Sequence, residues 1–218
     1  MPETTDAERT AVFIRSYERP ESSILETIRK EALETGVPVI RPEAGRLLSF
    51  FTEMTAPKRV LEVGCAVGYS ALLMLESMPE DGTILTIEHD GARAEKAREN
   101  FRRAGKEDRI SLTEGDAGEI LAKLEGSFDL VFMDAAKAQY ITWLPDVKRL
   151  LAPGGLLISD NILQEGDILE AKSAVSRRDR TIHKRMREYL EALTGDPELH
   201  TMLVPLGDGM AVTRKRIS

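Results

Sequence analysis

Two apolar segments of the chain end in side chains that could bind a divalent cation. Asp134 follows the segment Phe128–Met133, and Asp160 and Asn161 follow the segment Leu156–Ser159. Because the carboxyl ends of parallel strands meet along one edge of a sheet, we expect these three side chains to lie together. Two carboxylates and an amide oxygen form a hard donor set that suits Mg²⁺ or Mn²⁺. The alternative is that they only cap the elements that follow them.

A lysine lies close to the first of these carboxylates. Lys137 comes shortly after Asp134, near the start of a predicted helix, and should face the same crevice. A lysine beside a metal ion can have a lowered pKa and act as a general base. The alternative is that Lys137 forms an ion pair with the metal-binding carboxylates. The candidate catalytic residues are therefore Lys137 and Asp134.

A glycine-containing turn before a predicted helix favours an adenosine-bearing ligand. Gly64–Gly68 follows the apolar segment Arg59–Val63, the position at which a nucleotide meets a helix N-terminus. Glu88 ends the next apolar segment, near the offset of about 20 residues at which an acid accepts hydrogen bonds from ribose hydroxyls. Asp116 follows the third segment and should flank the adenine. The alternative for the turn is an ordinary connection between a strand and a helix.

The chain has a net charge of −7, yet many of its basic residues lie in one segment. Residues 172–187 contain seven basic side chains and one acidic side chain. Helical spacing would place four of the basic side chains in one stripe, which could hold phosphate groups. The alternative is an ordinary solvated helix face. The basic residues are Lys172, Arg177, Arg178, Arg180, Lys184, Arg185 and Arg187, and the stripe consists of Arg177, Arg180, Lys184 and Arg187.

The order of apolar segments and helical patterns predicts an α/β fold. A length of 218 residues and a hydrophobic content of 42% favour a single domain with a sizeable core. Strands that alternate with helices predict a doubly wound, mostly parallel sheet, with a C-terminal antiparallel hairpin at one edge and a helical extension over residues 1–58. The expected strands are Arg59–Val63, Thr83–Glu88, Ile110–Thr113, Phe128–Met133, Leu156–Ser159, Thr201–Pro205 and Met210–Thr213, and the last long helix spans about Val175–Leu193.

Cysteine content and the N-terminal segment bear on the compartment. The single cysteine, Cys65, excludes an intramolecular disulfide and a zinc site with several cysteines. The segment Met1–Asp6 has no signal-peptide pattern, and no apolar run approaches the ~18–20 residues of a membrane helix. These features favour a cytoplasmic protein without a membrane partner.

Five motifs form a combination that is specific to one family. They are Val60–Gly64, Gly68–Ser70, Thr86–Glu88, Phe128–Lys137 and Asp160–Asn161. Together they resemble the metal-dependent catechol and caffeoyl-CoA O-methyltransferases. The resemblance implies a Rossmann-like methyltransferase fold with a seven-stranded sheet, S-adenosylmethionine (SAM), a divalent metal, and methyl transfer to a hydroxyl next to a second oxygen. It implies a SAM site formed by Ile40, Glu62, Gly64, Ser70, Glu88, Ala117 and Asp134, and a homodimer for which the N-terminal helices are the candidate interface.

Four further segments resemble one branch of that family, the bacterial tRNA 5-hydroxyuridine methyltransferases. They are Val37–Ile40, Asp134–Tyr140, Arg177–Arg178 and Val204–Ala211, with Ala138 where relatives often have glycine. The resemblance implies that 5-hydroxyuridine at the wobble position of the tRNA anticodon is the methyl acceptor. The residues that would contact the tRNA are Arg177, Arg178, Arg180, Lys184 and Arg187.

Two aromatic residues could stack on the base. Tyr140 or Trp143 would lie near the acceptor, although core packing is the alternative for both.

Two other functions remain open. The first alternative function is a small-molecule O-methyltransferase that acts on catechol-like diols. The second is a SAM-binding protein without catalytic activity.

Overall fold

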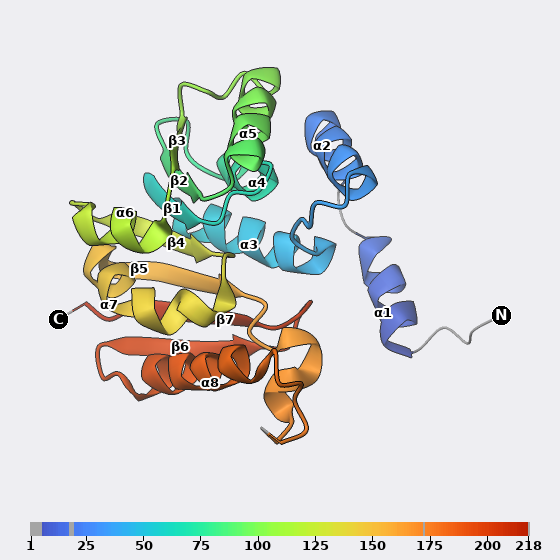
Figure 1. Cartoon of the computed structure of the whole chain (residues 1–218). Helices are drawn as coiled ribbons and strands as arrows, with labels where there is room; N and C mark the ends of the chain where they lie inside the picture. The colour runs from blue at the N-terminus through green and yellow to red at the C-terminus, as the bar shows by residue number, and fades with distance from the viewer. Residues whose placement is uncertain (1–5, 18–19, 172, 218) are drawn as a thin grey trace.

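The core of the protein is one twisted sheet (Figure 1). The computed structural model describes residues 6–17, 20–171 and 173–217, and within them the sheet has seven strands in the order β3-β2-β1-β4-β5-β7-β6. Residues 1–5, which make up most of the segment without a signal-peptide pattern, lie outside the described residues, as does Lys172 of the basic segment. The strands are β1 (Arg59–Val63), β2 (Thr83–Glu88), β3 (Ile110–Glu114), β4 (Phe128–Met133), β5 (Leu151–Asp160), β6 (Leu199–Val204) and β7 (Met210–Lys215).

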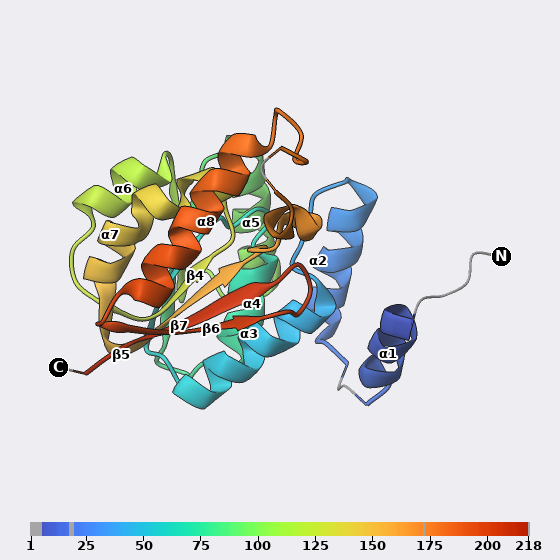
Figure 2. The ribbon, with the colours of Figure 1, turned by 90° about the horizontal axis from the view of Figure 1, so that it is seen from below.

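Helices cover both faces of the sheet, as the period of the apolar residues predicts (Figures 1 and 2). Side chains of α2, α3, α4 and α5 pack against one face, and side chains of α6, α7 and α8 pack against the other. The helices are α1 (Asp6–Arg15), α2 (Ser23–Glu34), α3 (Pro42–Thr55), α4 (Tyr69–Glu76), α5 (Gly91–Arg103), α6 (Ala117–Lys123), α7 (Tyr140–Leu150) and α8 (Arg180–Gly195), with short 3-10 helices η1 (Lys137–Gln139) and η2 (Gln164–Leu169).

Strands β1 to β5 run parallel, and β7 and β6 form the antiparallel hairpin at one edge. The chain order reverses between β1 and β4, which is where a doubly wound sheet opens a crevice at the carboxyl ends of its strands. Met133 of β4 lies opposite Ser159 of β5. The next residue along each strand is an aspartate, so the register brings Asp134 and Asp160 to neighbouring strand ends.

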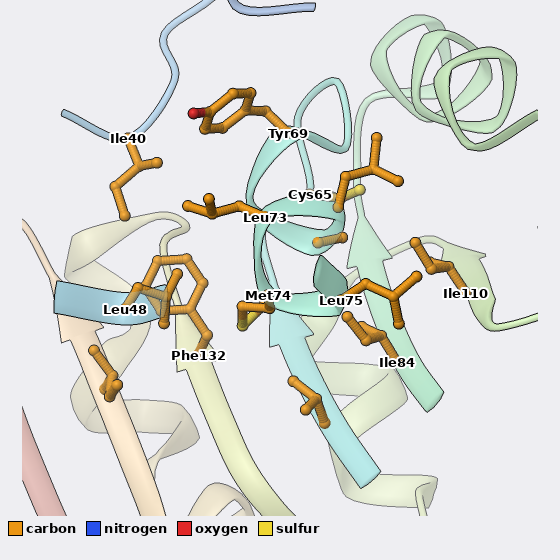
Figure 3. Packing of buried hydrophobic residues seen from close by; sticks show 14 of the residues in the cluster. Ile40, Leu48, Cys65, Tyr69, Leu73, Met74, Leu75, Ile84, Ile110 and Phe132 are labelled. Carbon is orange, nitrogen blue, oxygen red and sulfur yellow. The ribbon is translucent and has the colours of Figure 1, made fainter. Parts of the chain in front are cut away.

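One of the two hydrophobic clusters extends from the sheet to the N-terminal helices (Figure 3). Leu48 of α3 and Met74 of α4 are fully buried and pack in the same cluster as Phe132 of β4. Ile40 and Tyr69 belong to this cluster as well, above the strand ends. The segment between α2 and α3 is therefore anchored to the core next to the crevice.

Helix α1 differs from the other helices because it stands apart from the sheet in both views (Figures 1 and 2). Val12, Phe13 and Tyr17 are 64%, 63% and 77% exposed, although all three are large hydrophobic residues. No helix in the described residues is both long enough and apolar enough to cross a membrane.

The sequence placed most elements correctly, but the start of the last helix was wrong. Helix α8 begins at Arg180 and not near Val175. The Ser176 hydroxyl donates to the Asp179 carboxylate at 2.6 Å, and the Asp179 N–H donates to the Ser176 carbonyl at 3.0 Å. This local turn competes with helix formation, as serine and aspartate commonly do. Arg177 therefore lies before the helix and is not part of a helical stripe.

Candidate active site

A cavity of about 690 Å³ opens at the carboxyl ends of the parallel strands. Its wall contains every residue predicted to bind the cofactor except Glu62, and every residue predicted to bind the metal. The site residues predicted from the sequence that line the cavity are Ile40, Gly64, Ser70, Glu88, Asp116, Ala117, Asp134, Lys137, Asp160 and Asn161. Residues from separate strand ends thus converge as expected for an open α/β sheet.

The first glycine turn lies where two strand ends approach most closely. Gly64 has a positive φ of 98°, and a Cβ at this position would lie 2.1 Å from the carbonyl oxygen of Asp134. Only glycine fits this contact without a backbone shift. The Asp134 N–H also donates to the Val63 carbonyl at 2.9 Å. The turn and the β4 strand end are therefore held as one unit.

Glu88 has a fixed position beside this turn. One carboxylate oxygen accepts from the backbone N–H of Ala66 at 2.7 Å. The other accepts from the N–H groups of His89 at 3.0 Å and Asp90 at 2.9 Å. These bonds hold the carboxylate at the cavity wall, where its remaining lone pairs can accept from ribose hydroxyls.

Glu62 differs from the prediction because its side chain lies behind the cavity wall. It is fully buried and accepts hydrogen bonds from Ser70 Oγ at 2.6 Å and Thr86 Oγ1 at 2.5 Å. Burial raises the pKa of its carboxyl group to about 7, although both hydrogen bonds oppose the shift. Ser70 itself lines the cavity, so Glu62 acts on the ligand site by orienting Ser70.

The part of the cavity that is predicted to hold the adenine lies at the start of α6. Asp116 caps this helix, because its carboxylate accepts from the Glu119 N–H at 3.0 Å. Trp143 of α7 lines the cavity on this side, and a Cβ at Gly118 would lie 3.0 Å from its Nε1 atom. Tyr140 is fully buried and does not line the cavity. The prediction that Tyr140 could stack on a base was therefore wrong. Trp143 faces the α6 side of the cavity.

The predicted metal ligands form the opposite part of the cavity wall. Asp160 is 2% exposed, and burial together with the charge of Asp134 raises the pKa of its carboxyl group to about 6. In the part of the chain that is described, this carboxylate has no ion-pair partner and accepts one hydrogen bond, from the adjacent Asn161 N–H at 2.7 Å. A buried carboxylate with so few partners leaves lone pairs free for a cation.

The carboxylates of Asp134 and Asp160 and the amide oxygen of Asn161 form a set of donors that fits a hard divalent cation. Among the described residues no group of three or more His, Cys, Asp or Glu side chains is arranged to hold a metal ion. The third protein donor would therefore be the Asn161 amide oxygen. Asn161 has a positive φ of 56°, a conformation that asparagine tolerates better than most residues.

Lys137 forms an ion pair, which corrects the expected lowering of its pKa. Its Nζ donates to Asp134 Oδ1 at 2.6 Å and to the Tyr140 hydroxyl at 3.2 Å. Burial alone would lower the pKa of Lys137, but the Tyr140 hydroxyl and the Asp134 carboxylate outweigh it and raise the pKa. In the absence of a metal, Lys137 is therefore the protonated partner of Asp134.

The basic segment is only partly available for an anionic partner. Arg180 donates to the carbonyl groups of Val175 and Ser173, and Arg187 donates to those of Ile168 and Glu170. Lys184 pairs with Glu188 at 3.5 Å. The prediction of one continuous stripe was therefore wrong, since Arg177 lies before the helix and Arg180 and Arg187 hold the loop before α8. Among the described residues, the side chains of Arg177 and Arg178 are exposed and have no hydrogen-bond or ion-pair partner.

Several polar residues that line the cavity were not identified as site residues from the sequence. Three of them, Arg41, Glu165 and Asp208, come from the loop before α3, from η2 and from the β6–β7 hairpin. The hairpin sequence Gly207-Asp208-Gly209 signals a turn, but no local pattern shows that this turn reaches the cavity.

Comparison with known proteins places this geometry among O-methyltransferases. The O-methyltransferase family model matches residues 15–216. The chain is 34% identical over 146 residues to a catechol O-methyltransferase from Niastella koreensis, covering 64% of this chain and 66% of that enzyme. It is 33% identical over 195 residues to a putative O-methyltransferase from Mycolicibacterium vanbaalenii, covering 87% and 83% of the two chains.

Solved structures resemble the whole chain. The SAH-bound methyltransferase from Podospora anserina has a TM-score of 0.87 at 26% identity and covers 99% of this chain and 98% of its own. A putative caffeoyl-CoA O-methyltransferase from Staphylococcus aureus has a TM-score of 0.87 at 27% identity, with 96% and 100% covered.

The buried carboxyl group of Glu62 predicts a specific pH dependence of stability. Its folded-state pKa of about 7 lies above the ordinary value of 4.5 for a glutamate. Its contribution is therefore complete below the unfolded-state pKa and is lost as the pH rises through about 7. Relative to Glu62→Gln, the wild-type free energy of unfolding should fall by on the order of 3 kcal/mol between about pH 5 and pH 8. Urea titrations at several pH values measure it.

The exposed Glu125→Gln substitution is the control for this experiment, and its stability curve should follow that of the wild type. Parallel curves for the wild type and Glu62→Gln over the whole pH range would contradict the assignment of Glu62 as a carboxyl group that stays protonated in the folded chain.

Proposed function

Since this chain belongs to the O-methyltransferase family and is a SAM-dependent methyltransferase of the catechol and caffeoyl-CoA type, we propose that its acceptor is 5-hydroxyuridine in the tRNA anticodon. The observation that carries the proposal is the contact between the basic helix and the cavity. Arg185 of α8 donates to the Ala138 carbonyl at 3.0 Å, and Ala138 lies in η1 beside Lys137. This contact brings the part of α8 around Arg185 next to η1, on the acceptor side of the cavity.

The chemistry of the acceptor fits the predicted metal ligands. 5-Hydroxyuracil carries O5 and O4 on adjacent carbons, as a catechol carries two adjacent hydroxyls. A divalent cation held by Asp134, Asp160 and Asn161 would hold both oxygens and favour ionisation of the reacting hydroxyl. The rigid strand ends would then align this oxygen with the methyl group of SAM, and such positioning supplies much of the rate acceleration.

Lys137 is the proposed proton acceptor, and its ion pair sets the condition for that role. The Asp134 carboxylate keeps the lysine protonated as long as it is the main counter-charge. If Asp134 bound a cation, Lys137 would lose this stabilisation and its pKa would fall, so that it could accept a proton. The Tyr140 hydroxyl, which donates to the Met133 carbonyl at 2.9 Å, keeps the amine oriented through its contact with Nζ.

Fewer residues are proposed to contact the tRNA than the sequence indicated. Arg177 and Arg178 are exposed and unpaired within the described residues, so they can bind phosphate without giving up another contact. Arg180 and Arg187 support the loop that carries them. A small-molecule diol is the second candidate acceptor, and the 34% identity to a catechol O-methyltransferase favours it.

Methyl transfer from labelled SAM distinguishes the two acceptors. The protein should label an anticodon stem-loop that contains 5-hydroxyuridine when Mg²⁺ is present, and it should leave the same stem-loop with uridine unlabelled. Asp160→Ala should reduce the labelling at least a hundredfold, because a buried metal ligand is lost, while SAM binding measured by calorimetry is retained. Labelling of catechol alone would overturn the proposal of a tRNA acceptor. Labelling that chelators leave unchanged would overturn the proposed requirement for a divalent metal.

Neutral substitution of the two free arginines should weaken RNA binding in a salt-dependent way. The double variant Arg177→Ala, Arg178→Ala loses two phosphate contacts. The negative slope of log K against log salt should therefore become shallower by about 1 to 2. Binding to the stem-loop at several salt concentrations measures this slope. The matched control is Lys30→Ala, Lys123→Ala, which removes two exposed cations elsewhere. Equal slopes for the two double variants would contradict a specific role for Arg177 and Arg178.

We also propose that two copies of the chain associate through α1. Phe13 of this helix forms an edge-to-face aromatic pair with Tyr17 of the turn that follows it, and both are more than half exposed. Association would remove this apolar surface from water. Light scattering should show a dimer for the wild type and a smaller mass for Phe13→Ser, Tyr17→Ser. Leu169→Ser, at a residue 74% exposed elsewhere, should stay dimeric. A wild-type monomer would reject this interface.

A further inference from the structure

The cavity wall beyond the predicted metal ligands contains two acidic residues that the mechanism above does not use. Glu165 and Asp208 line the cavity together with Asp160 and Asn161. Glu165 follows β5, and Asp208 precedes β7, the next strand in the sheet. Glu88 and Asp116 lie on the other side, after β2 and β3. Glu165 therefore belongs to the side of the cavity opposite the cofactor residues, where the acceptor must lie.

The backbone that carries Glu165 is strained. Gln164 and Glu165 have positive φ values of 51° and 55°, and Gly166 follows with 96°. Two consecutive non-glycine residues in the left-handed region are unusual and persist only when their surroundings hold them. Moreover, the buried Nε2 atom of Gln164 has no hydrogen-bond partner among the described residues.

The β6–β7 hairpin holds this turn. The Asp208 carboxylate accepts from the Glu165 N–H at 2.7 Å, and the Asp208 carbonyl accepts from the Leu163 N–H at 2.9 Å. A Cβ at Gly209 would lie 2.3 Å from Leu163 Cγ, so the hairpin packs directly on the turn. Asp208 is 9% exposed, and its hydrogen bond to the backbone of Glu165 is therefore shielded from water.

The side chain of Glu165 is free to act on a ligand. Within the described residues its carboxylate makes no hydrogen bond and no ion pair, although it lines the cavity. The side chain of Glu165 is exposed at the cavity rim, and the strained turn fixes its backbone there, which makes it a candidate binding residue because local strain is concentrated at functional sites.

The proposed acceptor has one hydrogen-bond donor in a matching position. In 5-hydroxyuracil the ring position next to C4, on the side away from C5, is N3, which carries a hydrogen. When O5 and O4 face the ends of β4 and β5, this N–H points away from the methyl donor and needs an acceptor. A catechol has a C–H group at the corresponding position. A carboxylate there would distinguish the two acceptor classes, because sites that pair a polar group reject analogues without it.

We propose that Glu165 is a specificity-determining residue that accepts a hydrogen bond from N3–H of the 5-hydroxyuracil ring, and that Asp208 is the residue that positions it. This inference rests on the proposed function, because it assumes that acceptor. It assigns the discrimination between a pyrimidine and a catechol to one carboxylate, outside the metal ligands and the cofactor residues.

Two acceptors and one modified base test the role of Glu165. Wild type and Glu165→Ala are compared on a stem-loop with 5-hydroxyuridine and on free catechol. The ratio of kcat/KM for the stem-loop over that for catechol should fall 10- to 100-fold in the variant, since a hydrogen bond to a charged group is lost. The equilibrium Kd of the stem-loop, measured with SAH, should rise to a similar degree. A stem-loop with N3-methyl-5-hydroxyuridine should bind wild type and variant equally.

The control and the positioning variants address general damage to the fold. Asp167→Ala removes a carboxylate from the same short helix at a residue outside the cavity wall, and both acceptors should be used as by the wild type. Asp208→Ala should reproduce the selective loss, mainly as a rise in KM for the stem-loop, whereas Asp208→Asn keeps an oxygen that accepts from the Glu165 N–H and should restore the wild-type ratio. Thermal unfolding is followed for every variant.

The outcomes separate this inference from the function on which it rests. A wild-type protein that methylates catechol and ignores the stem-loop overturns the proposed function and this inference with it. A wild-type protein that methylates the stem-loop, with a Glu165→Ala variant that loses both acceptors equally or neither, overturns only the role of Glu165. An Asp208→Asn variant as impaired as Asp208→Ala overturns the positioning role.

Discussion

The site depends on the electrostatic balance among three charged groups at two neighbouring strand ends. The register of β4 and β5 brings Asp134 and Asp160 together, and burial denies Asp160 the solvation that would screen its charge. Lys137 neutralises Asp134 through its 2.6 Å contact, and the pKa of Asp160 rises as a result of burial and of the neighbouring carboxylate. In the proposed metal site, a bound cation would relieve the repulsion between these two carboxylates.

The same strand end also connects the two halves of the cavity. The carbonyl oxygen of Asp134 lies so close to Gly64 that no side chain fits between them, while its N–H is bonded to Val63. The turn that is predicted to face the cofactor and the carboxylate that is proposed to face the acceptor are therefore fixed to each other by backbone contacts. Distances between reacting groups that are set by a sheet vary less than those set by loops, which matters for a transfer reaction that depends on alignment.

The sequence predicted the parts of the molecule that local patterns determine. Apolar segments of parallel strands gave β1, β2 and β4 with their observed bounds, and the polar residues after them indicated the cavity. Contacts that decide between local alternatives are not visible in such patterns. Ser176 and Asp179 could continue a helix or form a turn, and their mutual hydrogen bonds select the turn. Whether Lys137 has a raised or lowered pKa depends on the balance between burial and Asp134, which requires coordinates.

Long-range contacts explain why the acceptor side was harder to predict than the cofactor side. Glu88 is held by amides that lie within 22 residues of it in the chain, and the Gly64 turn follows its strand directly. Glu165 is held by Asp208, 43 residues away, and Arg185 contacts Ala138 across 47 residues. These acceptor-side contacts join segments that are not part of the β1–β4 core, so a change in either partner alters the acceptor side without disturbing the strands that carry the cofactor residues. The fold thus permits acceptor preference to vary on a constant methyl-donor site.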